Sequence, residues 1–244
     1  PGYTHLQQAQ PILLAHYALS LFWALDRDAQ RLTDAADRAD VLPLGSGALA
    51  GSAFPLDRSF MAQELGFSRV SPNSLDAVSD RDYFLEALSA LSITIIHLSR
   101  YCEDIILWSS AEFGFVELDD AYSTGSSMMP QKKNPDSLEL VRGKSGRIVG
   151  GLVSLLMTMK GLGLTYGKDL QEDKEPVFDA FDTIDDCLDV FTAAWATMKV
   201  NVDRMESSID AGALATDLAD YLVRKGVPFR ESHHIIGQIV RSML

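Results

Sequence analysis

The residues with the clearest chemical potential lie together between Ser123 and Asp136, in a stretch of small and polar residues that also holds two lysines. It reads Ser-Thr-Gly-Ser-Ser-Met-Met-Pro-Gln-Lys-Lys-Asn-Pro-Asp. Glycine gives such a loop conformational freedom, so that Ser126 and Ser127 could close over a bound ligand. The pattern is equally compatible with a mobile, ligand-binding loop and with a plain linker.

The end of this stretch favours the start of a helix. Asn134 is suited to the N-cap position and Pro135 to the first helical residue. A helix start offers free N–H groups and a partial positive charge, and Lys132 adds a full charge nearby. These features together predict affinity for a carboxylate.

The charge distribution agrees with an anionic small ligand. The chain of 244 residues carries a net charge of −13, which argues against general nucleic-acid binding. Residues 131–174 nevertheless hold eight Lys/Arg against five Asp/Glu. A local excess of cations in an acidic protein suits an anionic substrate, although a solvated helix face would look the same.

Composition excludes several other classes of protein. The chain has no uncharged stretch of about 18 apolar residues, so no membrane span is expected. Its start has no basic region followed by an apolar one, so no secretory signal is expected there. Cys102 and Cys187 lie in apolar, helix-like segments, which predicts reduced core residues of a cytoplasmic protein.

Apolar periodicity predicts the elements that must position these residues. Apolar side chains recur at spacings of three, four and seven, and alternating patterns are nearly absent. The predicted long helices span 11–40, 74–110, 135–160 and 175–198, and two shorter ones span 217–224 and 230 onward. The predicted fold is all-α, an extended bundle of long helices that assembles into a multi-subunit helical core.

The predicted domains are a central bundle over residues 1–205, which carries the loop, and the start of a smaller helical domain over 206–244. Pro1 is not an initiator residue, and the last helical pattern stops without a cap. We therefore expect an internal piece of a longer chain.

The loop resembles the motif of the fumarase/aspartase superfamily, Gly-Ser-Ser-x-Met-Pro-x-Lys-x-Asn-Pro, at every position from Gly125 to Pro135. Further stretches resemble the argininosuccinate lyase branch in particular, and together they extend the resemblance over essentially the whole chain. They are 2–7, 131–139, 165–174 and 214–223. The resemblance implies a family N-terminal domain that is absent from this sequence.

The resemblance also implies residue roles. Ser126 would be the general base that removes the Cβ proton of the succinyl part. Lys132 would stabilise the carbanion-like state, and Asn134 would hold a substrate carboxylate. Ser126 must become alkoxide-like for this role, which Lys132 and loop N–H groups could support.

A second group of residues matches the family's remaining site positions. Thr4 would bind the substrate, and His5 would assist proton transfer, with Glu139 as its carboxylate partner. Tyr166, Gln171 and Lys174 would grip the two ends of the substrate. Gly167, where many relatives have asparagine, is a departure that touches no proposed role.

The implied activity is cleavage of argininosuccinate to fumarate and L-arginine by anti elimination, the last step of arginine biosynthesis, in a homotetramer with shared sites. No cofactor or metal is implied, and no Cys/His cluster has metal-ligand spacing. The alternatives are a sibling lyase on another succinyl substrate, a non-catalytic relative like the lens crystallins, and a helix bundle that binds no ligand.

Overall fold

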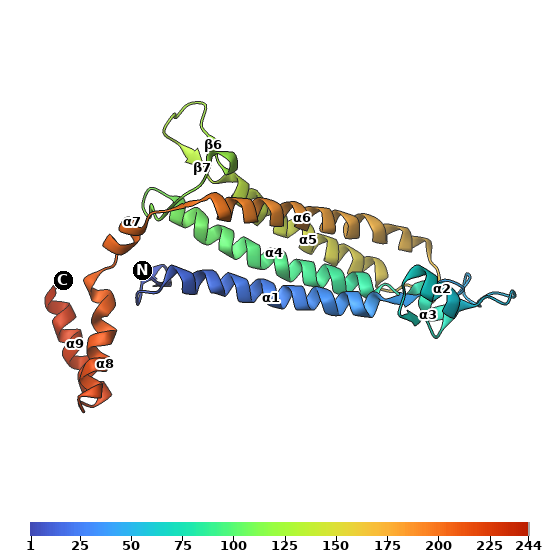
Figure 1. The fold of residues 1–244 in the computed structure, drawn as a ribbon, viewed down its shortest axis with the longest axis horizontal. Coiled ribbons are helices and arrows are strands. Elements are labelled where there is room, and N and C mark those ends of the chain that lie inside the picture. Colours follow the sequence, from blue (N-terminus) through green and yellow to red (C-terminus); the bar gives the residue numbers. More distant parts are fainter. Residues whose placement is uncertain (244) are drawn as a thin grey trace. The chain divides into compact units, whose positions relative to one another are not determined.

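The computed structural model describes residues 1–243, and its architecture is helical as predicted (Figure 1). Its helices are α1 (Leu14–Ala39), α2 (Arg58–Leu65), α3 (Ser74–Ser79), α4 (Asp82–Ser109), α5 (Asp136–Met159), α6 (Lys174–Thr197), α7 (Val202–Ser207), α8 (Ala215–Arg224) and α9 (Phe229–Met243). Three 3₁₀ helices add η1 (Asp120–Tyr122), η2 (Lys168–Asp173) and η3 (Ala211–Leu214). The all-α prediction is confirmed.

The strands are two residues long and form four isolated pairs in the described part of the chain. The antiparallel pairs are β1 (Tyr3–Thr4) with β2 (Gln7–Gln8), β5 (Val116–Glu117) with β8 (Lys199–Val200), and β6 (Thr124–Gly125) with β7 (Lys133–Asn134). The parallel pair is β3 (Val41–Leu42) with β4 (Arg69–Val70). Each pair connects two loop segments by backbone hydrogen bonds, and none of the pairs belongs to a larger sheet.

Contacts divide the chain into two compact units. One comprises residues 21–107 and 118–198; the other comprises residues 1–20, 108–117 and the C-terminal part from Lys199 onward. We call them the bundle unit and the terminal unit. The predicted domain boundary between residues 205 and 206 stays a prediction, because compactness within these units does not test it.

Four long helices of the bundle unit, α1, α4, α5 and α6, run side by side and alternate in direction (Figure 1). Their facing sides are apolar: the fully buried side chains include Leu88, Ile95, Leu98 and Ile105 on α4, and Leu138, Ile148 and Leu155 on α5. These positions continue the spacing of three, four and seven seen in the sequence. Burial of each such side chain contributes about 1.5–3 kcal/mol, so the apolar stripe is the main source of the bundle's stability.

Ion pairs tie the same helices together. Arg38 on α1 pairs with Glu86 on α4 at 2.7 Å. Arg142 on α5 pairs with Glu103 on α4, and Arg147 on α5 pairs with Asp179 on α6. Because all of these side chains are more than a third exposed, each pair adds little to the free energy of unfolding.

One helix prediction needs correction. The segment from Ser74 to Ser110, predicted as a single helix, is broken between α3 and α4. Asp80 has an extended backbone, and its carboxylate accepts a hydrogen bond at 2.8 Å from the amide of Asp82. Asp80 therefore ends one helix and caps the next, which apolar spacing could not reveal because the stripe continues across the break.

The other long-helix predictions are confirmed within a few residues of each end, and both cysteines lie in the core as predicted. Cys102 on α4 and Cys187 on α6 are buried. Burial raises the pKa of the Cys102 thiol to about 12 and also raises that of Cys187. Among residues 1–243, no helix is long and apolar enough to cross a membrane.

Candidate active site

The β6–β7 hairpin sets the geometry of the serine loop. Thr124 pairs with Asn134, and Gly125 pairs with Lys133. In an antiparallel register the next opposed positions are Ser126 and Lys132. The last paired residues are therefore followed directly by the predicted base on one side of the loop and by the predicted cation on the other, with residues 127–131 forming the tip.

The hydroxyl of Ser126 already accepts two amide hydrogen bonds. The N–H groups of Met128 and Met129 donate to its Oγ at 3.2 and 3.1 Å. Amide dipoles aimed at an oxygen stabilise negative charge on it. This arrangement provides the loop N–H groups that an alkoxide-like Ser126 would need.

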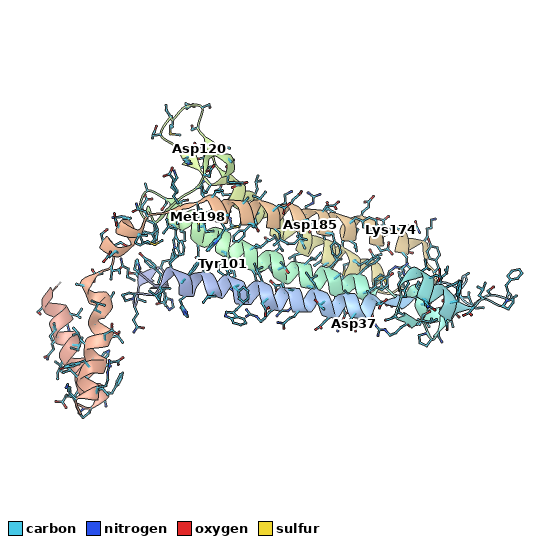
Figure 2. All side chains as sticks on the ribbon, viewed as in Figure 1. Asp37, Tyr101, Asp120, Lys174, Asp185 and Met198 are labelled. Atoms are coloured by element: carbon cyan, nitrogen blue, oxygen red, sulfur yellow. The ribbon has the colours of Figure 1, made fainter. Side chains whose placement is uncertain are left out.

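The two adjacent lysines have different surroundings. Lys133 forms an ion pair with Asp120 at 2.7 Å, and Figure 2 shows Asp120 beside the hairpin. Lys132 is exposed and forms no ion pair with any residue that the structure describes. Lys132 is thus the lysine whose charge is available to a ligand.

The predicted N-cap is wrong. The helix α5 starts at Asp136, and Pro135 is its N-cap residue, without a side-chain cap. Asn134 is instead held in β7 by its pairing with Thr124. Its side chain forms no hydrogen bond within residues 1–243, so the amide remains available for a substrate carboxylate.

Glu139 lies on the first turn of α5, close to the loop in the chain. Its carboxylate is 3.8 Å from the guanidinium of Arg142, which also binds Glu103. The hydrogen bond to Glu103 raises the pKa of Arg142.

Thr4 and His5 belong to the terminal unit, in the β1–β2 hairpin. The two loop residues, His5 and Leu6, have φ values of 56° and 57°. Both central residues of a type I′ turn need positive φ, and residues with side chains adopt it at a cost. Strain of this kind often accompanies a functional position. Here the turn places His5 at the tip of the hairpin, where the residue is exposed.

The segment from Tyr166 to Lys174 brings together all three residues predicted to grip the substrate. The side-chain amide of Gln171 donates to the hydroxyl of Tyr166. Thr165, just before Tyr166, has a φ of 73°, an unfavourable value for a β-branched residue. Lys174 begins α6 and is bound to Asp173 at 3.0 Å (Figure 2). This segment is locally ordered by its own side chains.

The serine loop and the Tyr166–Lys174 segment lie at opposite ends of α5 within the bundle unit (Figure 1). The helix has 24 residues, and at about 1.5 Å per residue it separates them by roughly 36 Å. One chain therefore does not bring Ser126, Lys132, Asn134 and Glu139 together with Tyr166, Gln171 and Lys174. A site that uses both groups needs more than one copy of the chain.

Sequence reasoning missed Asp173 and gave no role to Arg81. Asp173 is buried, and Arg81 donates to its Oδ2 at 2.5 Å. Asp173 lies in the stretch 165–174, which resembles the family, but the burial of one acidic residue within a polar stretch cannot be read from the sequence.

Comparison with known proteins agrees with the fold. A family model described as "Lyase" matches residues 1–150, more than half of the chain. The chain belongs to this lyase family. A second model, described as "Argininosuccinate lyase C-terminal", matches residues 212–244. The resemblance to the argininosuccinate lyase branch is thereby confirmed.

Curated relatives carry the same name. The argininosuccinate lyase of Herpetosiphon aurantiacus is 63% identical over 242 residues, which are 99% of this chain and 53% of that protein. That of Moorella thermoacetica is 60% identical over 100% of this chain and 53% of that protein. The chain thus spans about half the length of the curated relatives it matches.

Solved structures share the fold. EDDS lyase in complex with formate has a TM-score of 0.92 and 33% identity, covering 99% of this chain and 48% of that one. The 3-carboxy-cis,cis-muconate lactonizing enzyme from Pseudomonas putida has a TM-score of 0.83 and 25% identity, covering 100% of this chain and 55% of that one. Enzymes with different reactions share this scaffold, so the reaction must be argued from the site.

Proposed function

We propose that the full-length protein carrying this sequence cleaves argininosuccinate to fumarate and L-arginine. The observation that carries the proposal is the serine loop: Ser126 accepts two amide hydrogen bonds, and Ser126 and Lys132 each adjoin the last pair of the hairpin, Gly125 with Lys133. The relatives named argininosuccinate lyase, at 60% identity or more, support this substrate.

In the proposed reaction, Ser126 takes a proton from Cβ of the succinyl part. The electron pair left on carbon delocalises into the adjacent carboxylate, where Lys132 and Asn134 stabilise the growing charge. The bond between Cα and the guanidinium nitrogen then breaks, and the pair forms the double bond of fumarate. His5, oriented by Glu139, delivers a proton to the leaving arginine.

We further propose a homo-oligomer, a tetramer by the family resemblance, with sites shared between copies. The separation along α5 supports sharing. Exposed apolar side chains on the long helices support burial against other copies; they include Phe22 and Trp23 on α1, Val153 and Met157 on α5, and Phe178 on α6. The cytoplasm is the compartment we propose for it.

A second candidate is fumarate release from another substrate. A variant of EDDS lyase has been solved with bound fumarate, at a TM-score of 0.92 and 32% identity. The Tyr166–Lys174 segment favours argininosuccinate over this alternative, because it matches the argininosuccinate lyase branch. The test measures turnover of argininosuccinate and of other succinyl substrates side by side. Faster turnover of another succinyl substrate would favour the second candidate function over cleavage of argininosuccinate.

The first experiment follows fumarate by ultraviolet absorbance when the full-length protein meets argininosuccinate. Ser126→Ala should lower kcat by about 10²–10⁴-fold, the usual contribution of a general base. Ser127→Ala is the matched control, since Ser127 is exposed and lacks the paired amide contacts. Equal losses in both variants would remove Ser126 as the base, and no turnover by the folded parent would remove the proposed reaction.

A further inference from the structure

A buried carboxylate adjoins one of the proposed substrate-binding lysines but has no role in the reaction described above. Asp173 is only 1% exposed. Its Oδ2 accepts from Arg81 Nε at 2.5 Å, and its Oδ1 accepts from Lys174 Nζ at 3.0 Å. Both oxygens are engaged by cations, so Asp173 itself is not available to bind or deprotonate a substrate.

Arg81 is held on a second side as well. Its Nη1 donates to the backbone oxygen of Asp80 at 2.6 Å, in the break between α3 and α4. The remaining nitrogen, Nη2, has no hydrogen-bond partner within the part of the chain that the structure describes. The fixed guanidinium therefore keeps the two N–H groups of Nη2 for a ligand, and a guanidinium fork suits a carboxylate.

The two cationic side chains of this cluster converge on the same carboxylate. Arg81 binds one oxygen of Asp173 and Lys174 binds the other, while Asp80 adds a further carboxylate next to Arg81 in the chain. A buried carboxylate is costly without paired cations, so the contacts with Asp173 keep Arg81 and Lys174 together. A substrate carboxylate would bind the donors that Asp173 leaves open.

We propose that Asp173 is a positioning residue that holds Arg81 and Lys174 as a two-cation site for one substrate carboxylate, with Arg81 as a further substrate-binding residue. The identity of the substrate rests on the proposed function; the site itself requires only a carboxylate ligand. A purely structural ion pair, which joins the start of α6 to the start of α4, is the competing explanation.

A double-mutant cycle separates the two explanations. Asp173→Asn, Lys174→Met and the double variant are made in the full-length protein, with Glu172→Gln as a control at the exposed neighbouring position. The readouts are KM and kcat for argininosuccinate, the affinities for fumarate and for arginine by calorimetry, and Tm. The product whose affinity falls identifies which carboxylate the cluster binds.

If Asp173 acts through Lys174, each single variant should raise KM by about tenfold or more, and the double variant should be little worse than Lys174→Met alone. Asp173→Glu should recover part of the affinity, and Glu172→Gln should leave all values unchanged. Independent, additive losses, or losses in Tm with unchanged affinities for both products, would overturn the proposal.

Arg81→Lys covers the case in which Asp173→Asn fails to fold. It keeps the charge but removes the guanidinium fork, so affinity should fall by about tenfold with little change in Tm. Unchanged affinity would exclude Arg81 from the site. If the parent does not cleave argininosuccinate, the proposed function fails, while the calorimetric affinities still decide the role of Asp173.

Discussion

His97 Nδ1 on α4 lies 2.7 Å from Asp28 Oδ2 on α1, near the midpoint of both helices. The other oxygen of Asp28 accepts from Arg31 at 3.0 Å. Asp28 is 2% exposed, so its carboxylate depends on these two partners for its hydrogen bonds. This buried polar contact joins the middle of α1 to the middle of α4, whereas the pair of Arg38 with Glu86 joins the same two helices at an exposed position.

Asp28→Asn should lower the free energy of unfolding by about 1–3 kcal/mol, because it replaces one oxygen of a buried carboxylate that contacts both His97 and Arg31. Chemical denaturation of the parent and the variant would measure it. Asp34→Asn, at an exposed position on the same helix, is the control and should change stability by less than about 0.5 kcal/mol. Equal stability of both variants would show that the buried pair contributes nothing.

Lys132→Met should reduce kcat by about 10²–10³-fold, since it removes the cation that faces the developing charge in the proposed mechanism. Lys133→Met removes the pair with Asp120, whose carboxylate is 95% exposed, and should lower stability by about 1 kcal/mol, with kcat largely retained. Steady-state kinetics on argininosuccinate would compare the two adjacent positions. A larger loss of kcat in the Lys133 variant would reverse the assignment.

Mixing two inactive variants tests whether sites are shared between copies. Because α5 separates Ser126 from Lys174, a hybrid of Ser126→Ala and Lys174→Met chains can form some sites with both residues intact. Denaturing and refolding an equal mixture should restore up to about a quarter of the parent's activity, as expected for a symmetric oligomer with two-copy sites. Each variant refolded alone is the control, and a mixture no more active than these would place both residues in one copy's site.

Burial of Cys102 predicts a specific pH dependence. Its thiol has a pKa of about 12 in the folded protein, above the ordinary value of 9.0. The folded state therefore holds the proton more tightly, so stability is complete below pH 9 and falls as pH rises toward 12, by at most about 1.4 kcal/mol per pH unit. Unfolding of the parent at pH 9 and pH 11 should show a steeper decline than unfolding of Cys102→Ala, and equal declines would contradict the assignment.

Leu6 tests the strain in the turn that presents His5. Leu6 has a φ of 57° and is 69% exposed. Leu6→Gly should be more stable than Leu6→Val by about 1–2 kcal/mol, because glycine adopts positive φ freely and a β-branched residue does not. Thermal unfolding would compare the two, and a more stable Val variant would show that the turn relaxes.

The sequence predicted the long helices well because their information is local and repeated. Leu88, Leu98 and Ile105 mark one face of α4 over many turns, and no single exception changes that pattern. It could not predict the break at Asp80, where one side chain caps a helix inside an unbroken apolar stripe. The sequence also led to the wrong prediction that Asn134 is the N-cap of a helix. Asn134 instead pairs with Thr124, a residue ten positions away, and such pairing has no local signal.

The same limit applies to the candidate site. The motif identified Ser126 and Lys132, and the hairpin register supports their juxtaposition. No local pattern in the sequence shows that Asp173 is buried between Arg81 and Lys174. The contact of Asp173 with Arg81 joins positions that are 92 residues apart. Such contacts arise from packing and become visible only in three dimensions.

The hairpin register has a further consequence for how the serine loop could evolve and move. Ser126 and Lys132 follow directly after the last paired residues, Gly125 and Lys133, while residues 127–131 lie beyond them. Both residues are also bound to the tip: the amides of Met128 and Met129 donate to Ser126 Oγ, and the amide of Lys132 donates to the backbone oxygen of Met129 at 2.9 Å. Rearrangement of the tip would therefore change access to the site and the surroundings of the base and its cation together. Admission of substrate and the reaction are linked within one short loop, so a substitution in the tip would alter both.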